Sequence, residues 1–340
     1  MRAKFGFNIK EGDLMPISVK ESGTWKAGKL VYAKVGGAWQ QAKRIFTKIG
    51  GIWVGIWSAA YWTQKSNFQY ARKQGQAVGV NGYLYYIGGR YNNDYSGSGT
   101  YTNERWDPNT NTWTYLADCL YKKTDGWVAA RGQYIHVGSG TDHYYTHVMY
   151  DTNSNKWFSK NHITDAQGPC AAHAGDGNTI YMAGGWNGGS YYNSFYKWQD
   201  SVDYATSLTS MPMQRAWAAG GFINNKFYVI GGEISLGQLT NQCHVYNPDT
   251  NAWTQAADLP EQVSQSPHWV LNSKMYVIQN STSSKTFCYD PATNAWILGP
   301  TCPSNVYYAK GASLNGKGYV VGGIQQGTGN ITQTLYELTM

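Results

Sequence analysis

A seven-residue turn sequence that ends in tryptophan recurs along this chain of 340 residues. It reads DPNTNTW at 107–113, DTNSNKW at 151–157, NPDTNAW at 247–253 and DPATNAW at 290–296. In turns, Asp and Asn side chains bond to their own backbone, Pro fixes φ, and Asn tolerates the left-handed region. The recurrence therefore predicts an architectural turn in a repeat protein rather than a binding site.

Six strands, most of which end in Gly-Gly, set the period of the repeat. They start 43 to 51 residues apart. The sequence predicts a strand of small residues before each of them, and a third strand, the turn and a fourth strand after it. The six strands are YLYYIGG (83–89), YIHVGSG (134–140), TIYMAGG (179–185), KFYVIGG (226–232), KMYVIQN (274–280) and KGYVVGG (317–323).

Aromatic residues on the fourth strands indicate how this repeat would close. The last unit ends with ITQTLYELTM, which supplies a third strand but no fourth one. Trp62 lies upstream of the first Gly-Gly strand, so we expect its strand to complete the last unit and close a ring. The other closing aromatics are predicted to be Trp113, Trp157, Tyr204, Trp253 and Trp296.

Six four-stranded units in a ring predict an all-β fold, a six-bladed β-propeller. The composition agrees, because 40 Gly, 15% aromatic residues and only 14% charged residues suit short strands joined by tight turns. No long stretch has the apolar periodicity of an amphipathic helix. We expect the Gly-Gly pairs to allow close backbone approach near the axis and the tryptophans to pack between blades.

Residues 58–340 resemble kelch repeats, in which a Gly-Gly pair is followed by a polar loop and then by Tyr or Phe before D-P-x-T-N-x-W. The second unit departs from the pattern with Gly-Ser-Gly, the third lacks the D-P turn, and the fifth has Gln279-Asn280 where others have Gly-Gly. The resemblance implies a kelch propeller and says little about function, since one fold hosts many functions.

The first 57 residues contain a shorter repeat with a period of 14 residues. The segments SGTWKAGKLVYAKV, GGAWQQAKRIFTKI and GGIWVGIW align so that three tryptophans and two lysines fall in register. Gly-Gly pairs between alternating strands predict hairpins. We therefore divide the chain into a β-repeat module, residues 1–57, and a propeller, residues 58–340. The aligned residues are Trp25, Lys34, Trp39, Lys48 and Trp53.

This module resembles the short V-K-V-x-G-x-W repeats of bacteriophage tail and tail-fibre proteins, where such repeats stand beside host-binding domains. The resemblance implies that the five aligned residues attach the chain to other tail proteins. The module also holds ten basic and three acidic residues, whereas the remainder has 17 of each. That charge could meet nucleic acid, a membrane surface or another protein, or only solvent.

The expected location follows from what the sequence lacks. The N-terminus has no apolar run of a signal peptide, and no apolar stretch is long enough to insert into a membrane. Five scattered Cys show no zinc spacing and suit a reducing compartment. We expect a protein made in the host cytoplasm and carried in the virion tail, several copies per particle, without a cofactor or metal.

Loops that join second to third strands, and loops that join blades, are expected to share one face of the propeller. They are rich in Tyr, Asn, Gln, Ser and Gly, the mixture of adaptable binding loops. Flat aromatics can stack on sugars, and amides can bond to hydroxyls. The alternative is that these aromatics pack within their own loops. The candidate ligand-binding residues there are Tyr91, Tyr95, Tyr144, Tyr145, Trp186, Tyr191 and Tyr192.

Three basic residues, Arg72, Arg215 and Lys310, are expected at equivalent places after the inter-blade loops, and Arg90 follows the first Gly-Gly. In kelch propellers that bind acidic peptides, Arg at such positions rims the central channel, so the resemblance implies an anion site at Arg72, Arg90 and Arg215. Bonding to loop carbonyls is the other interpretation.

A metal site and three kinds of enzyme are the catalytic alternatives to a binding role. His143 and His147 lie on one side of an expected strand near Asp142, but no third metal ligand is apparent. Cys170 and His173 do not complete a copper-radical site, and the turns are not those of sialidases. The nearest enzyme resemblance is to kelch mutarotases acting on sialic acid, which would use Arg72, Arg90, Arg215 and Glu233.

The sequence therefore predicts a non-catalytic bacteriophage tail-fibre or tail-tip protein. Its module would attach to the virion, and its propeller loops would bind a glycan or protein on the host surface, with avidity from several copies. The alternatives are the sugar mutarotase and an intracellular kelch interaction adaptor.

Overall fold

A computed structural model of the chain describes residues 60–91, 99–140, 146–160, 172–202, 204–279 and 284–340, together with the backbone of four strands between residues 32 and 58. The chain forms two compact units, Met1–Tyr61 with Met340, and Trp62–Thr339. Every regular element in the described residues is a strand, which confirms the predicted all-β class. The described part of the chain has no helix that is long and apolar enough to cross a membrane.

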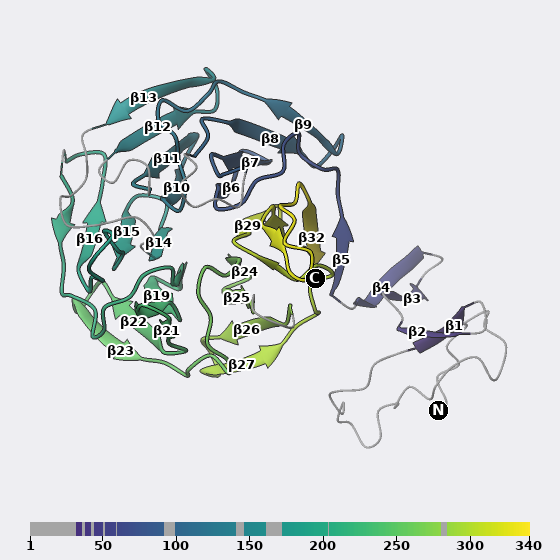
Figure 1. Cartoon of the computed structure of the whole chain (residues 1–340). Coiled ribbons are helices and arrows are strands. Elements are labelled where there is room, and N and C mark those ends of the chain that lie inside the picture. The colour runs from purple at the N-terminus through teal and green to yellow at the C-terminus, as the bar shows by residue number, and fades with distance from the viewer. Residues whose placement is uncertain are drawn as a thin grey trace. The chain divides into compact units, whose positions relative to one another are not determined.

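The second unit is a ring of six four-stranded antiparallel sheets, the blades (Figure 1). Blade 1 contains β6 (Gln76–Val80), β7 (Tyr83–Ile87), β8 (Asn103–Asp107) and β9 (Thr112–Tyr115). Blade 2 contains β10 (Trp127–Arg131), β11 (Tyr134–Gly138), β12 (His147–Asp151) and β13 (Lys156–Lys160). Blade 3 contains β14 (Ala172–Gly175), β15 (Ile180–Ala183), β16 (Phe195–Trp198) and β17 (Thr206–Ser207).

The remaining three blades repeat this order, with the first strand of each nearest the axis (Figure 1). Blade 4 contains β18 (Ala219–Ile223), β19 (Lys226–Ile230), β22 (Cys243–Asn247) and β23 (Ala252–Gln255), with the small hairpin β20 (Glu233–Ser235) and β21 (Gln238–Leu239) in its second-to-third loop. Blade 5 contains β24 (His268–Leu271), β25 (Lys274–Ile278), β26 (Thr286–Asp290) and β27 (Ala295–Leu298). Six blades confirm the predicted count.

Blade 6 closes the ring with strands from both ends of the propeller. It contains β29 (Lys310–Leu314), β30 (Lys317–Val321), β32 (Leu335–Thr339) and then β5 (Tyr61–Gln64). The amide of Lys65 donates to the carbonyl of Leu335 at 2.8 Å, and Trp62 Nε1 donates to the carbonyl of Pro300 in blade 5 at 3.0 Å. The predicted closure through the strand of Trp62 is confirmed.

The recurrent turn fastens blades 1, 2, 4 and 5 to the blade that precedes each of them. The Asn two residues ahead of the Trp has φ between 49° and 55°, and its Oδ1 accepts from one backbone amide of the preceding blade. The Trp Nε1 donates at 2.8 or 2.9 Å to the carbonyl of that same residue. These clamps are Asn111 and Trp113 on Ser66, Asn155 and Trp157 on Ala117, Asn251 and Trp253 on Thr209, and Asn294 and Trp296 on Ala257.

The described residues of blade 3 form no such clamp, and the prediction for Tyr204 is wrong. Tyr204 precedes β17 and is 68% exposed, so it does not pack against blade 2. The reason is local, because the turn that follows β16 has no D-P-x-T-N-x-W sequence to place an aromatic side chain between the blades.

The Gly-Gly pairs do allow a close approach, and their neighbour is the segment that leads into the next blade. A Cβ on Gly88, where φ is 66°, would lie 2.2 Å from the carbonyl oxygen of Lys123. A Cβ on Gly322, with φ of 64°, would lie 2.4 Å from that of Arg72. Only glycine satisfies both the space and the backbone angle, so these pairs set the distance between blades.

The first unit contains two hairpins, β1 (Tyr32–Val35) with β2 (Ala38–Gln41) and β3 (Arg44–Ile49) with β4 (Ile52–Ser58). Lys34 is opposite Trp39 in the first, and Lys48 is opposite Trp53 in the second. The two hairpins therefore place these residues at equivalent positions, one period of the short repeat apart. The predicted division after residue 57 falls at the end of β4, and Trp25 lies outside the described residues.

Candidate ligand-binding face

The loops proposed to share one face are tied together by backbone pairing. Lys73, ahead of blade 1, pairs with Arg90 in its second-to-third loop, and Ala216 pairs with Glu233 in the same way in blade 4. In blade 6, β28 (Val306–Tyr307) pairs with β31 (Ile324–Gln325). The second-to-third loops and the inter-blade segments therefore form one surface, which we call the loop face.

A ring of residues with left-handed backbone lies on the inter-blade segments of the loop face. The amide of Gln74 donates to Tyr308 at 2.9 Å, and that of Asp125 donates to Gln74 at 3.0 Å. The amide of Gln265 donates to Trp217 at 2.9 Å. All five have φ between 52° and 60°, although none is Gly or Asn. Such angles cost non-glycine residues about 1–2 kcal/mol each, so the blade-to-blade bonds must hold them.

This ring presents buried polar groups. Gln74 is 3% exposed and its Nε2 bonds to the Asp125 carboxylate, while its Oε1 has no hydrogen-bond partner among the described residues. Within that same part of the chain, Gln265 Oε1 and Trp217 Nε1 also lack partners. Buried donors and acceptors without partners are costly, so these atoms keep hydrogen-bonding capacity that the described residues do not use.

Aromatic side chains from blades 3 and 4 meet beside the ring. Trp217 lies 5.6 Å from Trp186 and 6.2 Å from Tyr191, measured between ring centroids. The hydroxyl of Tyr191 donates to Glu233 Oε1 at 2.6 Å. The structure thus brings together the sequence candidates Trp186 and Tyr191 with Trp217, which sequence reasoning missed. Tyr192 instead accepts a hydrogen bond from Asn187 within its own loop.

The basic residues expected at the channel rim are buried in the fold. Arg72 is fully buried and pairs with Glu104 at 2.6 Å. Arg215 donates to the carbonyls of Gly231 and Gln242 at 3.1 and 3.0 Å, and burial lowers its pKa to about 10. The interpretation as structural bonding is therefore favoured for both residues over an anion site. Arg90 is 5% exposed and donates to Thr124.

Lys310 is not equivalent to the two arginines, so that alignment is wrong. Lys310 begins β29, whereas Arg72 and Arg215 each precede the first strand of their blade by four residues. The equivalent residue in blade 2 is Lys123, which is fully buried, donates to the carbonyl of Ser139, and has its pKa lowered to about 8 by burial.

Of the remaining candidates, Tyr91 is 48% exposed and packs edge-to-face on Tyr70, which sequence reasoning missed. Tyr95, Tyr144 and Tyr145 lie outside the described residues.

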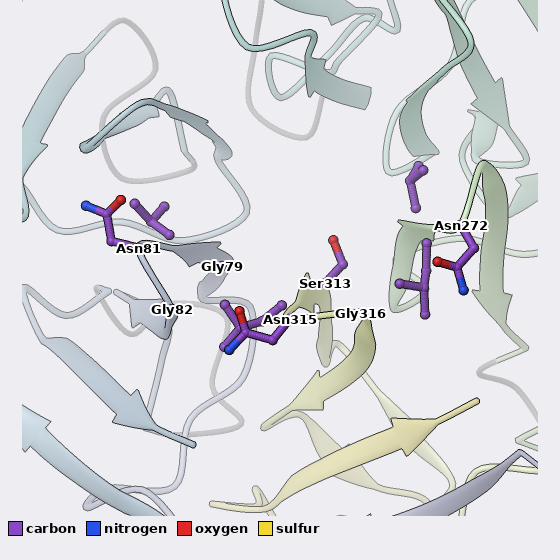
Figure 2. A pocket seen from close by; sticks show the side chains of 11 residues that line it. Gly79, Asn81, Gly82, Asn272, Ser313, Asn315 and Gly316 are labelled. Carbon is purple, nitrogen blue, oxygen red and sulfur yellow. The ribbon is translucent and has the colours of Figure 1, made fainter. Parts of the chain in front are cut away.

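The described residues that line the cavity on the axis carry no formal charge. A cavity of about 270 Å³ is lined by the six innermost strands, mainly by Ala, Gly and Val. A second cavity of about 370 Å³ opens among the first-to-second-strand turns of blades 1, 5 and 6, where Figure 2 shows Asn81, Asn272 and Asn315. The φ angles of these asparagines, 49° to 51°, match the type I′ hairpin turns that they form.

Two histidines that the sequence brought into the metal question belong to the core or the channel. His147 is buried against His136, with 3.0 Å between His136 Nδ1 and His147 Nε2, and both contact Trp198. His173 lies in the channel lining, 6.5 Å from His268 between ring centroids. The described residues contain no group of three potential metal ligands, and His143, Asp142 and Cys170 lie outside them.

The buried His136 predicts acid sensitivity. Burial lowers the pKa of His136 to about 4, below the ordinary 6.5, so between pH 4 and 6.5 the folded protein binds fewer protons than the unfolded chain. The contribution of this group to the free energy of unfolding should be fully present above pH 6.5. It should fall by roughly 3 kcal/mol as the pH drops from 6.5 to about 4. Replacing His136 by Phe should reduce the decline in the free energy of unfolding, measured with urea between pH 7 and 4.

Because His244 and His268 are also buried with pKa values lowered to about 4, the variant should keep part of the decline. An unchanged pH slope in His136→Phe would contradict the assignment.

Comparison with known proteins identifies the repeats. The family model of the Kelch motif matches residues 71–120 and 215–260. An F-box/kelch-repeat protein of Arabidopsis thaliana is 29% identical over 99 residues, which are 28% of this chain and 21% of that protein. Kelch-like protein 36 of Bos taurus is 23% identical over 232 residues, 64% of this chain and 38% of that protein. The chain thus spans well under two thirds of these relatives.

A solved structure of YjhT has the same fold. It superposes with a TM-score of 0.66 at 15% sequence identity and covers 81% of this chain and 99% of its own. At that identity the likeness concerns the fold alone.

Proposed function

We propose that this chain, a six-bladed propeller of kelch repeats, is the receptor-binding part of a bacteriophage tail fibre or tail tip. Residues 1–57 attach it to other tail proteins, and the loop face binds a glycan or protein on the host cell. It is made in the host cytoplasm and carried on the virion in several copies, which add avidity to weak individual sites.

The observation that carries a binding role is the contrast between the loop face and the channel. The loop face holds strained residues with unpartnered polar atoms, beside the aromatic group of Trp186, Tyr191 and Trp217. The described residues that line the axial cavity include His173 and His268 but no carboxylate, lysine or arginine beside them, and Arg72 and Arg215 are bonded inside the fold. These features favour recognition without bond cleavage.

The attachment role rests on the short repeat. Two hairpins with the same Lys–Trp register indicate a module that presents one motif repeatedly. Short hairpins bury little surface by themselves, and a repeated face of this kind suits docking on a larger assembly.

An interaction adaptor is the second candidate, favoured by the kelch-like and F-box/kelch relatives. The mutarotase alternative, which would act on a sialic-acid-like sugar, requires an acidic or basic group at the reacting carbon. Incubation of the purified protein with candidate sugars, followed by NMR of the anomers, separates a mutarotase from both binding roles.

Removing residues 1–57 tests the division of labour. The shortened protein should still bind cells of the bacterial host while no longer joining phage particles, because the loop face stays intact. A matched variant, Trp217→Ala, should join particles and bind cells more weakly, by about tenfold if the aromatic group contacts the receptor. Cell counts with labelled protein and particle composition after assembly give the two readouts. Loss of cell binding on truncation alone would refute the scheme.

A further inference from the structure

Three exposed tyrosines meet at the outer part of blade 1. Tyr70, Tyr91 and Tyr115 are 47%, 48% and 46% exposed, whereas Tyr85 and Tyr86 of the same blade are buried. The rings of Tyr70 and Tyr91 lie 5.9 Å apart at 71°. Burial, a hydrogen bond to Asp118 and the nearby phenol of Tyr91 raise the pKa of Tyr115. We call these three residues the tyrosine corner.

The buried residue Glu104 fixes the segment that carries Tyr70. One carboxylate oxygen accepts from the amide of Gln69, just before Tyr70, at 3.0 Å, and the other pairs with Arg72, two residues after it, at 2.6 Å. Glu104 is also the cross-strand partner of Tyr115.

Tyr91 is held by a separate contact. Its neighbour Arg90 exchanges backbone hydrogen bonds of 2.8 and 3.1 Å with Lys73. The three aromatic rings are therefore presented on a fixed frame, which lowers the entropy cost of binding through them.

The chemistry of the corner selects a class of ligand. Two perpendicular rings offer an apolar face and an edge, while the phenols, the Gln69 amide and the Asp118 carboxylate supply hydrogen bonds at the rim. Tyrosine combines a flat apolar body with a polar tip, which matches a pyranose. Arg72 pairs with Glu104, the side chains of Lys73 and Arg90 are buried, and Asp118 is acidic, so these residues present no exposed cation to a negatively charged sugar.

We propose that the tyrosine corner is a binding site for neutral glycans, separate from the ring and aromatic group around Trp217. The proposal rests on the proposed function, since it names the class of host-surface receptor and the place where it binds. Neither the period of the repeats nor the loop composition singled out this site, because only Tyr91 of the three lies in a second-to-third loop.

The test uses the full chain on an array of neutral hexose and N-acetylhexosamine oligosaccharides printed beside their sialylated counterparts. We expect neutral oligosaccharides to be bound. Tyr70→Ala and Tyr91→Ala should each weaken binding of the best neutral oligosaccharide about tenfold, whereas Tyr91→Phe should stay within about threefold of the parent. Tyr204→Ala, an exposed tyrosine on blade 3, should leave glycan binding unchanged, and thermal melts verify folding. Trp217→Ala is measured beside these variants, because it removes the aromatic group that the proposed function assigns to the receptor.

The outcomes separate this proposal from the broader one. Preference for sialylated glycans, loss of binding only in Trp217→Ala, or indifference to the double change Tyr70→Ala/Tyr91→Ala would each overturn the neutral-glycan site. Binding to host cells without binding to any arrayed glycan would overturn the site and leave the receptor-binding role standing. Neutral-glycan binding through the corner without attachment to bacterial cells would support the site and overturn the receptor-binding role.

Discussion

Replacing Glu104 by alanine should destabilise the propeller by about 3–5 kcal/mol, the cost of leaving one partner of a buried ion pair alone. Arg72 and Glu104 are fully buried, 0% and 1% exposed, and 2.6 Å apart. Without the carboxylate, the guanidinium keeps among the described residues a carbonyl of Tyr86 at 3.5 Å and the rings of Phe68 and Tyr86. The free energy of unfolding in urea measures the loss.

An exposed pair provides the matched control for Glu104→Ala. Lys285 and Glu261 are 42% and 32% exposed, so Glu261→Ala should cost less than about 1 kcal/mol. Replacing both buried partners, as Arg72→Met with Glu104→Leu, should recover much of the stability, because no unpaired charge remains. If Glu104→Ala were as mild as Glu261→Ala, the buried pair would not have the role assigned to it.

The fold was predictable because its determinants are local and repeated. Each turn of the form D-P-x-T-N-x-W encodes both halves of an inter-blade clamp, so the sequence motif and the contact coincide, as at Asn294 and Trp296 on Ala257. The prediction failed for Tyr204 because blade 3 lost the turn sequence while its sheet was retained. A strand can therefore persist without the motif that marks it, and a lone aromatic is weak evidence for it.

The candidate site was less predictable because its determinants are positional. The left-handed ring has Gln74, Asp125, Trp217, Gln265 and Tyr308 at equivalent places, and only Gln occurs more than once among these five. Their backbone angles are imposed by bonds between blades, which have no sequence signature. One signal was available, since Arg72, Lys123 and Arg215 each stand four residues before a first strand, and aligning on those strands would have excluded Lys310.

The sequence also did not predict the long-range ion pair between Arg72 and Glu104. Glu104 lies on the third strand of a blade and Arg72 between two blades, and their spacing in the sequence does not indicate that they pair. The proposal of a neutral glycan as ligand depends on the Arg72–Glu104 ion pair in two ways. It removes Arg72 from the set of anion-binding candidates, and it fixes the segment that carries Tyr70.

Removing β5 should be the most damaging small deletion in the propeller. A chain of residues 65–340 lacks Tyr61–Gln64 but keeps Lys65, which pairs with Glu337, and Ser66, which is held by Asn111 and Trp113. It should lose at least about 3 kcal/mol relative to residues 58–340, because Trp62 leaves blade 5 and β32 becomes an unprotected edge. Thermal unfolding should occur about 10 °C lower.

A second variant separates the effect of ring closure from the effect of an N-terminal extension, because it moves the sequence of β5 to the C-terminus. Appending a copy of the Asp290–Asn294 turn followed by YWTQ to the end of the 65–340 chain lets the same strand reach β32 from the other direction along the sequence. Stability should return to that of residues 58–340, because the clamp of Trp62 on Pro300 depends on position in the blade and not on chain connectivity. A scrambled YWTQ appended in the same way should not restore it. Full stability of the 65–340 chain without any appended strand would show that a three-stranded sixth blade suffices, and that the ring is held by the inter-blade clamps alone.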